Sequence, residues 1–347
     1  MNSKTSHSSS QRYEGCTLTG ALSITTQVED AVTVVHGPEG CAHHNVSLLH
    51  AAMAEQGHPA IPKIVPTRLS EQGVIFGGEE DLAATLRAMA DRRPGVIFVL
   101  TTCITETIGD DAASVCSEDY GVPVVLLPTA GFLGGCFSDG LNAALTTMAA
   151  KADPVEGAGE TVTIIGEKNL EYEVEENFAE VERLLASLGL EVGLRFVRDV
   201  RYADLKQVGT GRLNVLREPS LAPVGEALKE RFGTPYISSF PIGLDGSIAF
   251  LEEVGTLLGL RTDGAVRREE ERQSAMLDSF ADLRGSVFSI DPMTFRALEC
   301  TPVRRVMEAL DLQVDSDGAG VSLPYSPPVG TAGIRRLLHR WRRRVHA

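Results

Sequence analysis

Aromatic residues and long apolar runs are both scarce in this chain of 347 residues. Aromatics make up 5% of it, with a single tryptophan, and the longest uncharged apolar stretch, residues 120–138, is interrupted by prolines and glycines. Such an interrupted stretch excludes a membrane span. A secretory signal is missing as well, because residues 1–13 are polar and rich in serine, so we expect disorder there and a cytoplasmic protein.

Positive charge is in deficit, with 32 lysines and arginines against 47 aspartates and glutamates and a formal net charge of −15. This balance argues against a nucleic-acid partner. The Walker A strings GxxxxGKS and GxxxxGKT are absent, so we expect no ATP hydrolysis by this chain. Six arginines and no acid fall within residues 335–344, a basic segment that either docks on an acidic partner or folds back on its own subunit.

Six cysteines, at positions 16, 41, 103, 116, 136 and 300, occur in a chain that shows no secretion signal. That setting disfavours a disulfide framework and favours free thiols, metal ligands or catalytic groups. The places of the cysteines in the fold therefore decide between these roles.

Apolar, β-branched runs alternate with amphipathic segments along most of the chain. This alternation predicts an α/β fold class of successive doubly wound, Rossmann-like parallel sheets. The expected strands are residues 31–35, 96–100, 122–127, 162–165, 192–197, 213–216 and 287–290. The expected helices are residues 79–91, 142–152, 173–188, 224–232, 247–258 and 302–310.

Two polar segments suggest boundaries between domains. Residues 151–160 form a polar link, and residues 262–274 carry a run of charges that we interpret as an exposed helix face. The chain is thereby divided into an N-terminal α/β domain (14–152), a second α/β domain (161–262) and a truncated third α/β region (275–347). In the last region only one strand and one helix are recognisable before the arginine-rich helix.

Three cysteines lie at or near the ends of expected strands, where open α/β sheets build their sites. Cys41 follows the strand 31–35 through a glycine-rich turn, Cys103 follows the strand 96–100, and Cys16 lies in an extended entry segment. The spacing of these residues fits neither a zinc knuckle nor a ferredoxin run. Spacing alone thus leaves inert thiols and metal ligands both open.

Several strings around these cysteines resemble the nitrogenase component 1 family. His36-Gly-Pro-Glu-Gly-Cys41 resembles its HGxxGC signature, and Ser70–Gly78 is similar to its SEDxAVFGG stretch. Residues 101–111 resemble TTCxxExIGDD in the β (K-type) form, and Phe240-Pro-Ile-Gly-Leu244 resembles a later FP(I/F)G segment. The order and spacing agree as well, and the resemblance extends over residues 14–300.

In that family, the cysteines of these motifs ligate an iron-sulfur cluster between two homologous subunits. The resemblance therefore implies that Cys16, Cys41 and Cys103 in the N-terminal domain hold a P-cluster (8Fe-7S) or a simpler 4Fe-4S cluster, shared with a second subunit. Thiolates are soft, anionic donors suited to such clusters. Where K-type subunits carry a serine, this chain has Cys136 nearby, either as an additional cluster ligand or as a small residue packed at a helix start.

The resemblance also implies which ligands this chain lacks. In nitrogenase, a second-domain cysteine and a third-domain histidine hold the catalytic cofactor, but residues 213–220 contain no cysteine and the late histidines His339 and His346 lie in the arginine-rich segment. Cys300 is interpreted as a structural thiol. We therefore expect a K-type subunit that relays electrons from an ATP-dependent iron protein to a cofactor in a homologous α (D-type) subunit of a heterotetramer.

Among nitrogenase-like systems, methylthio-alkane reductase resembles this shortened K-type chain best, which implies reductive carbon–sulfur cleavage. Two alternatives stay open. One is a homodimeric tetrapyrrole reductase similar to the nickel-sirohydrochlorin cyclase, and the other is a scaffold for cofactor assembly. Around the cysteines, His43 and His44 either tune the cluster or pack as polar residues, and Glu106, Asp110 and Asp111 are expected to cap or orient the helix after Cys103.

Overall fold

The computed structural model describes residues 15–55, 57, 60–131, 135–152, 159–290, 301–323 and 326–346. The predictions for residues 1–13 and for Cys300 fall outside these residues. The chain forms two compact units: unit 1 contains residues 1–171 and 193–236, and unit 2 contains residues 172–192 and 237–347. The three-part division into domains expected from the sequence stays a prediction.

The first sheet of unit 1 is parallel throughout, with strand order β2-β1-β3-β4. Its strands are rich in β-branched residues. Strand β1 is largely buried and β3 is buried along its whole length, whereas β2 is half-buried. Their bounds are β1 (Ala31–His36), β2 (Ile64–Pro66), β3 (Val96–Thr101) and β4 (Val124–Pro128). The helices between them are α2 (Glu39–Glu55), α3 (Glu71–Phe76), α4 (Glu79–Ala90), α5 (Cys103–Ile108) and α6 (Ala112–Cys116).

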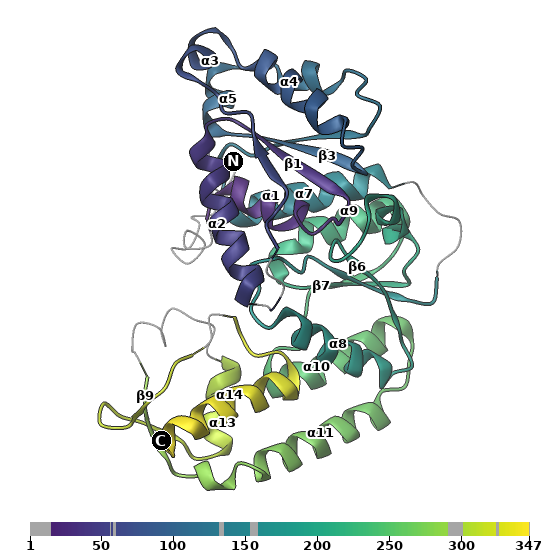
Figure 1. The fold of residues 1–347 in the computed structure, drawn as a ribbon. Coiled ribbons are helices and arrows are strands. Elements are labelled where there is room, and N and C mark those ends of the chain that lie inside the picture. Colours follow the sequence, from purple (N-terminus) through teal and green to yellow (C-terminus); the bar gives the residue numbers. More distant parts are fainter. Residues whose placement is uncertain are drawn as a thin grey trace, which may run out of the picture. The chain divides into compact units, whose positions relative to one another are not determined.

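Helices cover both faces of this sheet, as Figure 1 shows. Alternate strand residues point to opposite faces: Ile97 and Val99 pack with Leu86 of α4, whereas Phe98 and Leu100 join the core around α1 (Thr17–Thr25) and α7 (Phe137–Lys151). The arrangement confirms the doubly wound α/β fold expected from the sequence.

Helices α1 and α7 cross at two glycines. A Cβ atom on Gly20 would lie 2.0 Å from the Phe137 carbonyl oxygen, and one on Gly140 would lie 1.9 Å from the Thr17 carbonyl oxygen. Only residues without a Cβ allow the two backbones to approach this closely. All nine residues of α1 are buried as a result, and its N-terminal end is held at a fixed depth in unit 1.

The second sheet of unit 1 has the order β6-β5-β7-β8, and β5 pairs with β7 in parallel. Its strands are β5 (Val162–Ile165), β6 (Val192–Phe196), β7 (Leu213–Leu216) and β8 (Tyr236–Ile237). Three helical segments accompany it: η3 (Tyr202–Gly209), η4 (Pro219–Leu221) and α9 (Ala222–Phe232). Strands β5 and β7 have the bounds that the sequence predicts.

Unit 2 combines helices with a three-stranded parallel sheet of order β10-β9-β11. The strands are β9 (Val287–Ser289), β10 (Gln313–Val314) and β11 (Ala319–Gly320). The helices are α8 (Val174–Ala186), α10 (Gly243–Leu258), α11 (Asp263–Asp278), η5 (Ala281–Leu283), α13 (Thr301–Ala309) and α14 (Gly330–Val345). The prediction of a single strand in this region was wrong, because two of the strands are only two residues long and carry no periodic pattern.

The arginine-rich segment forms α14 and folds back on its own unit, which is one of the two outcomes expected. Its apolar face, including Leu338 and Trp341, is buried in the core of unit 2, and Trp341 Nε1 donates a hydrogen bond to the Ser322 carbonyl at 3.2 Å. On the polar face, Arg336 and Arg340 both pair with Glu173, at 2.8 and 2.7 Å.

The charged run of α11 is exposed only in part. Glu269 is 2% exposed and bonds Arg183 at 2.8 Å, so the expectation of a wholly exposed face was wrong at this residue. A buried carboxylate needs such a partner, and a sequence pattern does not show it. Within the described residues, no helix has both the length and the apolar character required to cross a membrane.

Candidate functional site

Cys16, Cys41 and Cys103 each stand at the start of a helix. Cys16 is the N-cap of α1, Cys41 lies in the first turn of α2, and Cys103 is the first residue of α5. Free backbone N–H groups give a helix N-terminus a partial positive charge. Cys41 was expected in a loop, but the Gly-Pro-Glu-Gly string turns directly into a helix.

The three thiols lie within electrostatic reach of one another. Burial raises the pKa of the Cys41 thiol, and the neighbouring Cys16 and Cys103 raise it further. Cys41 and Cys103 are half-buried and Cys16 is exposed. Cys41 thus lies near enough to the other two thiols for their charges to act on it, and Cys16 is accessible to a partner molecule.

The donor set suits an iron-sulfur cluster. Three thiols are soft donors, and bound iron would offset the mutual repulsion that opposes their ionisation. In the described part of the chain, no group of three histidines, cysteines or acidic residues could hold a metal ion as it stands. His43 and His44 follow Cys41 on α2 and are both exposed.

The turn before Cys41 packs directly on the residue before Cys103. A Cβ atom on Gly37 would lie 2.2 Å from the Thr102 hydroxyl oxygen, so only glycine fits there. The Thr102 backbone N–H donates to the His36 carbonyl at 3.1 Å. Because these contacts join the ends of β1 and β3, they fix Cys41 relative to Cys103.

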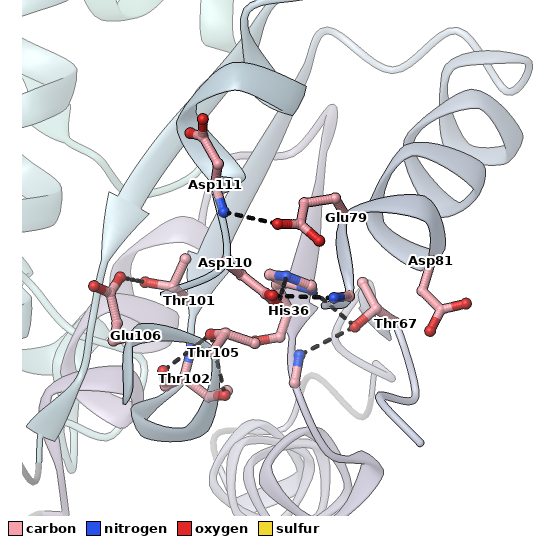
Figure 2. Close-up of polar contacts among 12 residues, drawn as sticks. His36, Thr67, Glu79, Asp81, Thr101, Thr102, Thr105, Glu106, Asp110 and Asp111 are labelled. Carbon is pink, nitrogen blue, oxygen red and sulfur yellow. Dashed lines mark hydrogen bonds and ion pairs between the residues drawn. The ribbon is translucent and has the colours of Figure 1, made fainter. Parts of the chain in front are cut away.

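A buried histidine connects all three sequence motifs, as Figure 2 shows. His36 Nε2 bonds Asp110 Oδ2 at 3.1 Å, and His36 Nδ1 bonds the Thr67 hydroxyl at 3.1 Å. Asp110 Oδ1 accepts a hydrogen bond from the Gly78 backbone at 3.0 Å. Burial lowers the pKa of His36, and the attraction of Asp110 offsets this only in part. The neutral ring donates a hydrogen bond from Nε2 to Asp110, and so it holds the end of β1 to the segment that follows α5.

The residues expected to orient the helix after Cys103 have more varied roles. Glu106 accepts from the Thr101 hydroxyl at 2.5 Å, and Asp110 bonds His36 as described above. Asp111 caps the following helix, α6, by accepting from the Ser114 backbone at 2.9 Å. Its own backbone N–H donates to Glu79 Oε1 at 3.2 Å (Figure 2). The sequence did not indicate that Asp110 bonds His36.

Cys136 is the N-cap of α7. Its backbone N–H donates to Asp139 Oδ2 at 2.7 Å. In return, the backbone N–H of Asp139 donates to the Cys136 thiol. Burial raises the pKa of this thiol, and the side-chain hydrogen bond with Asp139 adds to the effect. These contacts correspond to a residue packed at a helix start, and a ligand role for Cys136 stays a prediction.

Cys116 lies at the C-terminal end of α6, away from helix N-termini. Burial raises its pKa to about 11, so it remains a protonated, inert thiol at neutral pH.

An exposed apolar patch lies beside the cysteines. Val74, Ile75 and Phe76 on α3 are 40%, 72% and 84% exposed, and α3 packs against α5, which begins at Cys103. Ile104 of α5 is 38% exposed. We call these four residues the apolar patch. Exposed apolar groups of this kind mark contact sites for other proteins. The sequence alone did not suggest this role, because Val74, Ile75 and Phe76 form an apolar run of the kind found in protein cores.

The carboxyl end of β7, where the sequence lacks a cofactor cysteine, holds an ion pair. Arg217 Nε donates to Glu171 Oε1 at 2.6 Å, and the two side chains are 10% and 2% exposed. Nearby, Glu167 bonds Arg195 at 2.7 Å. Buried charges are tolerated because they are paired in this way.

Two known proteins similar to this chain both carry nitrogenase names. The nitrogenase iron-molybdenum cofactor biosynthesis protein NifE of Clostridium pasteurianum is 28% identical over 297 residues, which cover 82% of this chain and 63% of that protein. The nitrogenase molybdenum-iron protein alpha chain of Methanococcus maripaludis is 26% identical over 294 residues, covering 78% and 61%. This chain therefore spans less than two thirds of the length of either relative.

A solved structure shares the fold. The structure "Nitrogenase Cp1 at pH 5" superposes with a TM-score of 0.65 at 21% identity, covering 86% of this chain and 63% of that one. The family model of the nitrogenase component 1 type oxidoreductases matches residues 16–290. The chain thus belongs to the nitrogenase component 1 type oxidoreductase family.

Proposed function

We propose that this chain is the electron-relay subunit of a nitrogenase-like reductase. Cys16, Cys41 and Cys103 would hold an iron-sulfur cluster, of the P-cluster or 4Fe-4S type, shared with a homologous second subunit. The observation that carries the proposal is the charge interaction of Cys41 with both Cys16 and Cys103, three thiols from separate segments that each begin a helix. A bound cluster would supply reversible electron storage.

The residues around the thiols support this role. Backbone N–H groups at the starts of α1, α2 and α5 stabilise anionic sulfur, and the His36–Asp110 contact at 3.1 Å keeps two of the ligand loops in place. Because three ligands from one chain leave a cluster incomplete, the homologous α (D-type) subunit would supply the remaining ones. Cys136 would join them only if the cluster rearranges toward α7.

The apolar patch supports docking of the electron donor. Phe76 is 84% exposed on a short helix packed against α5, so a protein bound there would approach the cysteines. We infer that the ATP-dependent iron protein binds over this patch. The Arg217–Glu171 pair at the end of β7 supports the view that a catalytic cofactor belongs to the partner subunit. For the substrate, we propose a methylthio-alkane cleaved reductively at its carbon–sulfur bond.

A second function is favoured by one specific observation. Relatives named as cofactor biosynthesis proteins and an alpha chain are among those compared, whereas the motif at Cys103 resembles the K-type. We therefore keep a scaffold for cofactor assembly as the alternative. Such a scaffold would use the same three thiols but would show no turnover.

The ligand assignment is tested by removing one thiol at a time. The full chain, coexpressed with its genomic neighbours, would be purified without oxygen, and its iron and subunit ratio measured. We expect Cys41→Ser and Cys103→Ser each to lose most of the iron and the cluster's electronic spectrum, while Cys116→Ser keeps both. Retention of full iron by Cys41→Ser would contradict the proposal.

The same preparations separate the alternatives. A complex of two different homologous subunits that consumes reductant with an iron protein and ATP supports the relay. The same complex without turnover supports the scaffold. A dimer of this chain alone with four irons per subunit pair rules the relay out and favours the tetrapyrrole reductase. Unchanged redox spectra in Cys136→Ala would remove that residue from the ligand set.

A further inference from the structure

Unit 2 contains a cavity of about 430 Å³ between α11 and the first half of α14. Arginines from both helices line it: Arg272 of α11 and Arg335 and Arg336 of α14. The remaining lining residues are small or uncharged, among them Met276 and Ser279, and none is acidic. The cavity is formed by residues of unit 2, whereas the candidate cluster ligands belong to unit 1.

Two of these guanidinium groups lack a counter-ion. Arg336 is neutralised by Glu173 at 2.8 Å and also donates to Asn177 at 3.1 Å. For Arg272 and Arg335, in contrast, no acidic partner occurs in the described part of the chain. A chain with 47 acidic residues could neutralise both. Both guanidinium groups are exposed, so an anion that enters this open cavity would meet two positive charges without acidic partners.

Two acids that bond to lining residues of the cavity are already engaged with other partners. Glu269 accepts from the Thr331 hydroxyl at 2.6 Å and pairs with Arg183 at 2.8 Å. Glu180 accepts from the Ala332 backbone at 3.0 Å and pairs with Arg183 at 2.8 Å. Both carboxylates are 2% exposed, so neither can turn outward to meet Arg272 or Arg335.

His339, on the same helix as Arg335, is affected by the positive charges of the neighbouring arginines. Burial lowers the pKa of His339, and the positive charges of Arg335, Arg342 and Arg343 lower it further.

We propose that this cavity binds a small organic oxyanion, a phosphate ester or a polycarboxylate. Arg272 and Arg335 would grip the oxyanion from opposite helices, since the planar guanidinium matches both carboxylate and phosphate in bidentate fashion. Met276 would contact the apolar part of the molecule. The volume of about 430 Å³ falls in the range of small-molecule sites and exceeds what an inorganic ion needs.

The test uses two probes and the full chain. Inorganic pyrophosphate represents phosphate chemistry and malonate represents the dicarboxylates, and binding is measured by calorimetry at constant ionic strength. We expect Arg272→Gln and Arg335→Gln each to weaken binding about tenfold or more, because each substitution removes one charged hydrogen-bond donor to the anion. Arg344→Gln, an exposed change on the same helix outside the cavity, should leave affinity within about twofold.

A conservative variant guards against misfolding. Arg335→Lys keeps the charge and loses the planar fork, so we expect a smaller loss than with glutamine, and melting curves show whether each variant folds. Binding of pyrophosphate alone supports a phosphate ester, and binding of malonate alone supports a carboxylate. The proposal is overturned if neither probe binds, or if Arg344→Gln weakens binding as much as Arg335→Gln does.

Discussion

His36 is a fully buried residue on which the candidate site depends. It lies at the end of β1, where its ring joins Asp110 and Thr67 at 3.1 Å each. The sequence showed the glycines and cysteines of three motifs, but it could not show this contact, because its partners are 31 and 74 residues away along the chain. Local sequence motifs indicate candidate ligands, but they do not predict hydrogen bonds between residues that are far apart in the sequence.

The lowered pKa of His36 predicts a loss of stability in acid. An unfolded histidine takes up a proton near its ordinary value of 6.5, while the buried ring resists it, so the free energy of unfolding should fall as the pH drops below 6.5. The slope from this one group approaches about 1.4 kcal/mol per pH unit. Urea unfolding between pH 7.5 and 5.5 measures it.

His36→Gln serves as the comparison for that experiment. The variant is less stable throughout because the Asp110 carboxylate loses its partner, but its pH profile should be flatter below 6.5. Parallel profiles of the two proteins would show that other groups cause the acid sensitivity.

At the scale of helices and strands, the α1–α7 crossing determines where Cys16 lies. A Cβ atom at position 140 would lie 1.9 Å from the Thr17 carbonyl oxygen. Because that oxygen belongs to the backbone, the clash can be relieved only if α1 moves. We expect Gly140→Ala to destabilise the chain by about 1–3 kcal/mol, and to reduce iron content by displacing Cys16. Thermal unfolding and iron analysis check the two effects.

Gly246→Ala is the matched control for that variant. Gly246 lies within α10, where a Cβ atom would meet its nearest neighbour at an ordinary 3.5 Å. Because alanine is the better helix former, this change should stabilise the protein by about 0.5–1 kcal/mol. Equal destabilisation by both substitutions would show that the close crossing is unimportant.

Elements with a strong pattern were predicted well. The strands β5 and β7 match the expected bounds, since a short run dominated by apolar or β-branched residues signals a buried strand. Helix α2 was missed because only Ala42, Asn45 and Leu49 of its residues are buried, which leaves little amphipathic pattern. The start of α7 was placed late because Gly140 suggests a turn where the structure has a close helix crossing.

At the scale of the whole molecule, unit 2 contains a buried charge network around Arg183. Arg183 bonds Glu180 and Glu269, each at 2.8 Å and each 2% exposed, so removing the arginine leaves two buried carboxylates without it. We expect Arg183→Gln to destabilise unit 2 by about 3 kcal/mol. Hydrogen exchange should then accelerate in α8, α11 and α14 and change little in the first sheet of unit 1.

An exposed ion pair provides the control. Arg212 bonds Glu160 at 3.1 Å, but Glu160 is 90% exposed, so Arg212→Gln should alter stability by well under about 1 kcal/mol. If exchange in Arg183→Gln rose equally in both units, the two would unfold as one, contrary to this prediction.

The path of the chain through the two units has a consequence for biosynthesis. Every residue of unit 1 precedes position 237, whereas α8 of unit 2 is made early and its partners α11 and α14 are made last. At roughly 5–20 residues per second, the ribosome spends several seconds on residues 237 onward. During that interval Cys16, Cys41 and Cys103 can already be folded in place on the nascent chain, while α8 still awaits its partners. Unit 1 can therefore fold before the partners of α8 have been synthesised.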